Sequence, residues 1–265
     1  MATQPYPYTH SPPLSPLSTL PSQSLSTTSD PPIAHLMTSV LILRQPRTRS
    51  PSQSQYPPPP SPPQILLLRR SPTDSYPLKW ETPGGSVDPA DPSLLSAAAR
   101  ELHEEARLSN PRFHALVGMA RSLNAREAAR MGEWGIPPEE EDAKDVLLLL
   151  LPLPLQEGMS GGGGGGGLEV KVTTFLETGN VWGKMNLIAT VDEDDCEGVV
   201  TDPEEHCEWG WFTEEEVRRG RARRVDDGED GEGREREMVL EFTSQAVWGS
   251  ILESFRVGRE LGLIL

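Results

Sequence analysis

Three glutamates lie three and four residues apart in the segment R-E-L-H-E-E, residues 100–105: Glu101, Glu104 and Glu105. In an α-helix this spacing places the three carboxylates within an arc of about 100° on one face. Like charges at such spacing repel one another, so a cation is expected among them. Hard divalent ions such as Mg²⁺ prefer oxygen ligands. The spacing therefore indicates a divalent-metal site, and the alternative is an acidic face that contacts solvent only.

The residues upstream predict the turn and the helix that position these acids. Pro83-Gly84-Gly85, followed by Pro89 and Pro92, is typical of a turn, and glycine lets a ligand approach the main chain closely. A helix is expected to begin near Ser93, a favoured N-cap residue type. Apolar residues at helical spacing predict its buried face: Leu95, Ala98, Ala99, Leu102 and Ala106.

This stretch resembles the Nudix box, G-x5-E-x7-R-E-U-x-E-E-x-G-U, where U is a bulky aliphatic residue. Residues 100–105 match R-E-U-x-E-E without a gap, and Leu108 matches the final U. Fourteen residues separate Gly85 from Arg100 where the pattern has thirteen, and Asp91 is the expected substitute for the first Glu. Arg107 replaces the late Gly, at a position that resembles a left-handed helix end.

The resemblance implies a fold and an activity. The fold is an α/β class, a Nudix-like α/β/α sandwich with a mixed β-sheet. The activity is hydrolysis of the pyrophosphate bond in a nucleoside diphosphate linked to another moiety, with Mg²⁺ or Mn²⁺ as cofactor. Because the box departs from the pattern, the alternatives are a Nudix-fold module that binds nucleotides or a protein without turnover, and an unrelated acidic interaction protein.

The resemblance also implies roles for individual residues. Arg100 would orient the acids through a bidentate pair. Glu101 would be a ligand or the general base, and Glu205 is a second candidate base. The implied metal ligands are the carbonyl of Gly84 and the carboxylates of Glu101, Glu104 and Glu105, with Glu105 also counted among the catalytic residues.

A second stretch, P-E-E-H-C-E-W-G-W-F-T-E-E-E-V from Pro203, also resembles Nudix domains. There Glu204 or Glu205 is a candidate further acid facing the metal, and His206 is a candidate phosphate contact. The alternative is a surface loop whose acids only contact solvent. Four tryptophans are candidate stacking partners for a base, although each also fits a core or rim position: Trp134, Trp182, Trp209 and Trp211.

The composition argues against a general nucleic-acid-binding protein, a disulfide-rich protein and a membrane-spanning protein. The 265 residues include 27 Pro and 24 Gly and are only 35% hydrophobic, so much of the chain is not core. The net charge of −16 argues against general binding to nucleic acid. The two cysteines, Cys196 and Cys207, are too few for a disulfide framework, and no apolar run reaches the roughly 18 residues of a membrane span.

We expect residues 1–34 to be a disordered Ser/Thr/Pro-rich tail and residues 35–265 to form one Nudix-like domain. Low-complexity insertions are expected near 45–63, 156–168 and 219–237. The tail has neither the basic start nor the apolar core of a signal peptide, which predicts a cytoplasmic or nuclear protein. The sequence gives no indication of the oligomeric state.

Apolar runs predict the sheet. Residues 35–43 and 64–69 are expected to form a hairpin, and a closing helix is expected to begin near Thr243. The box helix would cover one face of the sheet and the closing helix the other. Further strands are expected at residues 113–123, 145–151, 170–176 and 184–191.

Overall fold

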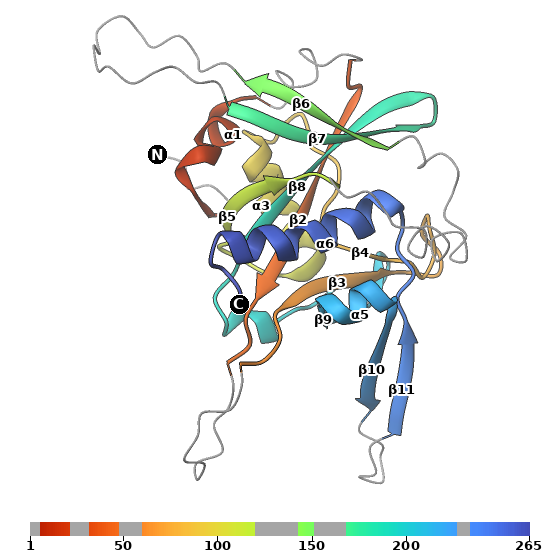
Figure 1. Cartoon of the computed structure of the whole chain (residues 1–265). Helices are drawn as coiled ribbons and strands as arrows, with labels where there is room; N and C mark the ends of the chain where they lie inside the picture. Colours follow the sequence, from red (N-terminus) through yellow and green to blue (C-terminus); the bar gives the residue numbers. More distant parts are fainter. Residues whose placement is uncertain (1–5, 22–31, 48–59, 120–142, 151–167, 227–233) are drawn as a thin grey trace, which may run out of the picture.

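The computed structural model describes residues 6–21, 32–47, 60–119, 143–150, 168–226 and 234–265 (Figure 1). The helices are η1 (Pro12–Leu14), α1 (Ser15–Thr19), α3 (Leu94–Ala106), η3 (Asp195–Glu197), α5 (Glu214–Arg219) and α6 (Gln245–Glu260). The strands are β1 (Thr9–His10), β2 (His35–Arg44), β3 (Gln64–Arg70), β4 (Trp80–Glu81), β5 (Arg112–Val117), β6 (Lys144–Leu150), β7 (Leu168–Glu177), β8 (Asn180–Thr190), β9 (His206–Thr213), β10 (Arg221–Asp226) and β11 (Arg234–Val239).

Nine of these strands form one mixed sheet in the order β1-β5-β8-β2-β3-β4, with β7 also paired to β8, β6 paired to β7, and β9 paired to β3. The expected hairpin of β2 and β3 is limited to its base, where Leu43 lies opposite Ile65 and Arg44 opposite Gln64. Beyond that point β2 runs parallel to β8, and β3 instead pairs with β9 and β4. The two strands therefore form the expected hairpin only over these two residue pairs and separate beyond them.

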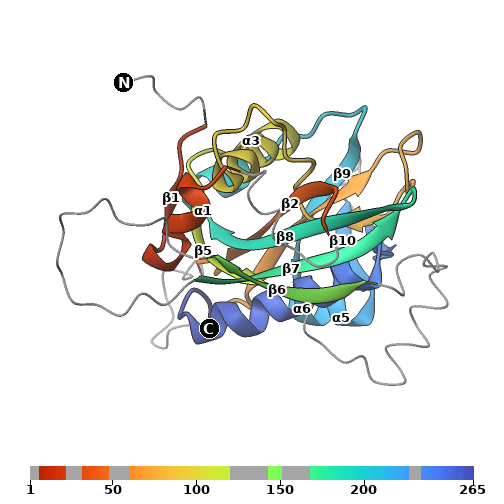
Figure 2. The same ribbon diagram turned by 90° about the horizontal axis from the view of Figure 1, so that it is seen from above.

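The sheet separates two hydrophobic layers, because alternate residues of a strand point to opposite faces. Figure 2 shows α3 on one side of the sheet and α6 on the other, as the sequence predicted. On the α3 side lie Val40, Ile42, Leu66 and Leu68. On the α6 side lie Leu41, Leu43, Ile65 and Leu67, together with Phe255 of α6. The predicted α/β/α sandwich is confirmed.

The box helix begins and ends where the sequence predicts. Ser93 is its N-cap, and the side-chain oxygen accepts a hydrogen bond from the Ser96 backbone N–H at 3.2 Å. Arg107 ends the helix in the left-handed region, with φ of 56°. The buried face includes Leu95, Ala98 and Leu102. This apolar face packs the helix against the sheet. Its glutamates instead contact Arg100 and the Gly84 turn.

Residues 6–21 correct the expectation of a disordered tail over residues 1–34. β1 pairs in parallel with β5, and Leu14, Leu17 and Leu20 are buried in the core layer of α3. These leucines recur every three residues, a helical spacing that the abundant Ser and Pro obscure. Residues 1–5 and 22–31 of the expected tail lie outside the residues that the structure describes.

The insertion expected at 219–237 is also corrected in part. Its flanks form the antiparallel pair β10 and β11, and Ala222 and Met238 are buried in the α6-side layer. Arg221 of β10 also forms an ion pair with Glu237 of β11 at 3.2 Å. Most of the insertions expected at 45–63 and 156–168, and the end of the strand predicted at 113–123, lie outside the described residues. Among the helices described, none is long and apolar enough to span a bilayer.

We expect Leu17→Ala to lower the free energy of unfolding by about 2–5 kcal/mol, because it leaves a cavity beneath α3. Leu17 is 0% exposed, whereas Thr19 two residues later is exposed. Thr19→Ala is therefore the matched control and should change little. Urea unfolding followed by circular dichroism measures both, and equal stabilities of the two variants would contradict the packing of residues 6–21.

Arg107→Gly should raise the free energy of unfolding by roughly 0.5–1 kcal/mol, since glycine adopts the left-handed conformation without the steric cost of a Cβ atom. Arg107→Ala keeps the Cβ atom and removes the same charge, so its stability should match that of the parent protein. The comparison uses thermal melts. A stabilisation shared by both variants would instead point to the lost charge.

Candidate metal and phosphate site

The Gly84-Gly85 turn lies between strand β2 and helix α3. The Gly84 backbone N–H donates a hydrogen bond to the Glu105 carboxylate at 2.7 Å. Gly84 has φ of 152°, and a Cβ atom there would lie 2.1 Å from the Thr38 carbonyl oxygen. At Gly85 a Cβ atom would lie 2.6 Å from the Glu101 carboxylate. Only glycine fits at Gly84, and the turn therefore reaches the acids of the helix with its bare backbone.

Arg100 organises the acids of the box. Its Nε and Nη2 atoms donate to the two carboxylate oxygens of Asp91 at 3.0 and 2.9 Å, a bidentate pair. Its Nη1 atom lies 2.9 Å from Glu101 and 2.8 Å from Glu104. The hydrogen bonds that Arg100 donates to Asp91 raise the pKa of Arg100 above its ordinary value. Asp91 thus lies where the first acid of the box would pair with the arginine.

The three helix glutamates face different surroundings. Glu104 is exposed beside Arg100, whereas Glu101 is buried between Arg100 and Gly85. Glu105 is partly buried and turns toward Gly84. Burial raises the pKa of Glu101. Burial, followed by the negative charge of Glu81, raises the pKa of Glu105 well above its usual range. Glu105 is therefore the acid with most to gain from a nearby cation.

The loop that precedes β9 brings two further groups to Glu105. One ligating atom each of Glu105, Glu205 and His206 all lie within 4.8 Å of one another. Glu205 is exposed, and His206 is 2% exposed. Two segments that are far apart in sequence thus supply one cluster. Glu101 and Glu104 are not members of this trio, although the negative charge of Glu101 contributes to the raised pKa of Glu105.

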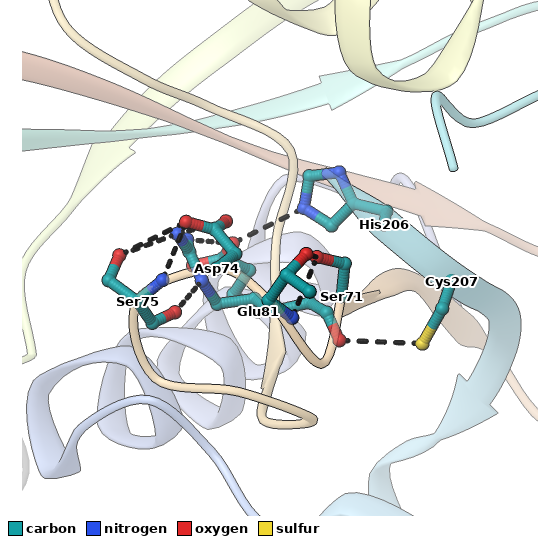
Figure 3. A network of polar contacts seen from close by, with 8 residues as sticks. Ser71, Asp74, Ser75, Glu81, His206 and Cys207 are labelled. Atoms are coloured by element: carbon teal, nitrogen blue, oxygen red, sulfur yellow. Dashed lines mark hydrogen bonds and ion pairs between the residues drawn. The ribbon is translucent and has the colours of Figure 1, made fainter. Parts of the chain in front are cut away.

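A network of polar contacts reaches the cluster through His206 (Figure 3). Glu81 accepts from the Arg70 Nη1 atom at 2.5 Å, and its Oε1 atom lies 3.3 Å from the His206 Nε2 atom. Arg70 also pairs with Asp74 at 2.5 Å. Burial opposes ionisation of Glu81, but the His206 hydrogen bond and the Arg70 charge outweigh burial and lower its pKa. Cys207 Sγ contacts the Arg70 carbonyl at 3.4 Å.

A cavity of about 170 Å³ lies beside this network and shares Arg70 and Glu81 with it. Both charged and aromatic side chains line it. Lys184 of β8 is a second cation in its wall. Further lining residues are Tyr76, Phe175 and Asn186. The cavity therefore places positive charge and flat apolar surface next to the Glu105 cluster.

Sequence reasoning missed Glu81, Arg70 and Lys184. Glu81 lies three residues before Gly84 in W-E-T-P-G-G, and that proximity was the available signal. Among the tryptophan candidates, Trp211 is buried and donates to the Cys196 carbonyl, so it belongs to the core. Trp182 stacks on His35. Trp209 is partly buried against the core layer of α3, and Trp134 lies outside the described residues.

The donor set suits a divalent cation. Carboxylate oxygens and an imidazole nitrogen are ordinary ligands of such ions. The Nδ1 atom of His206 is buried and has no hydrogen-bond partner among the described residues, an arrangement that a bound cation would satisfy. The arrangement can thus hold a cation next to a cavity lined by Arg70 and Lys184 as well as by Glu81 and Glu177, and a bound divalent cation can promote cleavage of a phosphate ester or anhydride.

Part of the chain matches a known protein family. Residues 60–149, which contain the glycine turn and α3, match the NUDIX domain family profile. No curated protein sequence matches the chain. Similar solved structures include the binary complex of a C. elegans Ap4A hydrolase, 16% identical over 86% of this chain and 98% of that one, with a TM-score of 0.41. Another is the Nudix hydrolase RenU from M. smegmatis, 15% identical over 86% of each chain, with a TM-score of 0.37.

The matched residues carry the bidentate arginine, the clustered acids and the glycine turn described above, and the strands around them form the expected sandwich. Residues 60–149 of the chain therefore match a NUDIX domain.

Proposed function

We propose that this protein hydrolyses the pyrophosphate bond of a nucleoside diphosphate linked to another moiety, in a reaction that depends on Mg²⁺ or Mn²⁺. One observation carries the proposal. Glu105 is joined to the Gly84 amide on one side and clustered with Glu205 and His206 on the other, near a cavity whose lining includes Arg70 and Lys184. Phosphate, cation and attacking water would all meet at this point.

The metal ligands that we propose from the box are Glu101, Glu104, Glu105 and the Gly84 carbonyl, and the geometry favours Glu105 as the central one. Its position beside both segments supports this role. A bound divalent cation would neutralise charge on the diphosphate and lower the pKa of water. Arg100 is a positioning residue, because it contacts Asp91, Glu101 and Glu104.

The walls of the cavity favour an anionic substrate with a flat group. Arg70 and Lys184 provide positive charge in a chain whose net charge is −16, so binding of phosphates would depend on these local cations. Tyr76 and Phe175 provide aromatic surface against which a base can stack.

We propose Glu205 as the general base. Glu101 lies 2.9 Å from the Arg100 guanidinium, and this ion pair holds its carboxylate away from proton transfer. Glu205 is exposed and lies within the Glu105 cluster, so it is positioned to accept a proton from water. Its replacement should reduce turnover more than it reduces binding of substrate.

The departures from the box leave its contacts intact. The turn that contains the extra residue is closed by hydrogen bonds from Asp88 N–H to Asp91 at 2.8 Å and from Ala90 N–H to Asp88 at 2.6 Å. Arg100 still reaches Asp91 across this turn. Arg107 lies at the far end of the helix, where the left-handed conformation is retained. These contacts favour an enzyme over a module without turnover.

Incubation with Mg²⁺ and a substrate panel tests the activity. The panel contains ADP-ribose, NADH, diadenosine polyphosphates, capped RNA and oxidised dGTP. We expect Mg²⁺-dependent release of a nucleoside monophosphate from at least one compound, slowed about a hundredfold or more by Glu105→Gln. Glu215→Gln, on the exposed surface of α5, is the control and should retain full activity. Nucleotide binding without turnover across the panel would favour the non-catalytic module.

Glu105→Gln should also raise the melting temperature in EDTA at neutral and basic pH. The folded state raises the Glu105 pKa, so it binds more protons than the unfolded state, and stability falls as pH rises from the unfolded pKa through the folded one. Glutamine does not titrate, so the gain should vanish below the unfolded pKa. Thermal melts from acidic to basic pH measure this. A variant that melts below the parent at every pH would contradict the assignment.

A further inference from the structure

His206 is held rigidly at the start of β9. Its backbone N–H donates to the Asp202 carbonyl at 2.7 Å, and the residue lies opposite Arg70 in the sheet. The side chain is 2% exposed. A ring fixed in this way is preorganised, because neither the backbone nor the imidazole can move far without breaking the network around it.

One ring nitrogen of His206 already has a partner. The Nε2 atom lies 3.3 Å from the Glu81 carboxylate, and Glu81 also accepts from Arg70. An ionised carboxylate only accepts hydrogen bonds, so Nε2 carries the proton and donates it. In a neutral ring the lone pair then lies on Nδ1. Figure 3 shows the second ring nitrogen directed away from Glu81.

The Nδ1 atom is buried and has no partner among the described residues. Burying a polar atom without a partner is unfavourable, so such an atom calls for a bound group. In metal sites the ligating histidine commonly donates its other ring N–H to a carboxylate, which fixes the tautomer and the ring orientation. The pair of Glu81 and His206 has this arrangement.

The spacing of the cluster also fits a single ion. Nitrogen and oxygen ligands lie about 2.0–2.3 Å from a divalent cation, so two ligands of one ion lie at most about 4.6 Å apart. The ligating atoms of Glu105, Glu205 and His206 lie within 4.8 Å of one another. Glu105 and His206 are therefore close enough to share one ion, with Glu205 beside it.

We propose that His206 is a nitrogen ligand of the cation at Glu105, and that Glu81 is the positioning residue that orients its ring. The inference rests on the proposed metal site and adds a residue that the box does not contain. Imidazole binds Mn²⁺, Co²⁺ and Zn²⁺ more readily than it binds Mg²⁺. The site should therefore discriminate between these metals more strongly than a site made of oxygen ligands alone.

Pulsed electron paramagnetic resonance of the full-length protein with Mn²⁺ alone tests the proposal. We expect a nitrogen coupling to Mn²⁺ in the parent protein that changes when its histidines are labelled with ¹⁵N. The labelling needs no substitution, so it avoids any effect of a variant on folding. Mn²⁺ bound without histidine nitrogen coupling would overturn the proposal.

Substitution identifies which histidine is the ligand. His206→Gln should abolish the coupling and weaken Mn²⁺ binding by about 10–100-fold, with a smaller loss for Mg²⁺. His103→Gln is the matched control, because His103 lies on α3 but contacts Ser109. Circular dichroism melts show whether each variant is folded. A coupling that survives in folded His206→Gln, or disappears in His103→Gln, overturns the assignment.

The same samples separate this inference from the proposed function. Mg²⁺-dependent hydrolysis by a parent protein that shows no histidine coupling would refute the nitrogen ligand and leave the enzyme intact. A parent protein that neither binds Mn²⁺ nor hydrolyses any compound of the panel would refute both.

Discussion

The hydrogen bond from the Gly84 amide to the Glu105 carboxylate is the contact on which the site depends. The contact requires glycine at this position, because a Cβ atom on residue 84 would lie 2.1 Å from the Thr38 carbonyl oxygen. The turn can therefore lie directly on β2 and still reach α3. The sheet layer, the N-cap at Ser93 and the buried leucines of α3 hold the two partners at this separation.

Bringing these carboxylates together causes electrostatic repulsion, and cationic side chains offset part of that repulsion. Arg100 forms ion pairs with Asp91, Glu101 and Glu104 and so offsets part of their charge. Arg70 and His206 stabilise Glu81 beneath it. Glu105 is left with the Gly84 amide and with acids nearby, and burial and these charges raise its pKa. The residual negative charge is the physical basis for cation binding, since a divalent ion supplies what the protein does not.

Much of this structure was predictable from local sequence patterns. Periodicity and capping located α3 and its N-cap Ser93, and the resemblance to the Nudix box implied the left-handed end at Arg107. Long-range features were not predictable. The parallel pairing of β2 with β8 is set by packing across the sheet, and the leucines of residues 6–21 are hidden among Ser and Pro. Glu81 and His206 are 125 residues apart, so no local pattern indicates that they meet.

The convergence of the glycine turn, α3 and the loop before β9 around one cation is the central claim. Addition of substoichiometric Mn²⁺ to isotope-labelled protein, followed by amide NMR, tests it most directly, because the paramagnetic ion broadens signals from nearby residues first. The amides of Gly84, Glu105 and His206 should broaden together. Persistence of these signals while amides of the acidic segment 192–197 broaden would place the cation elsewhere and contradict the account.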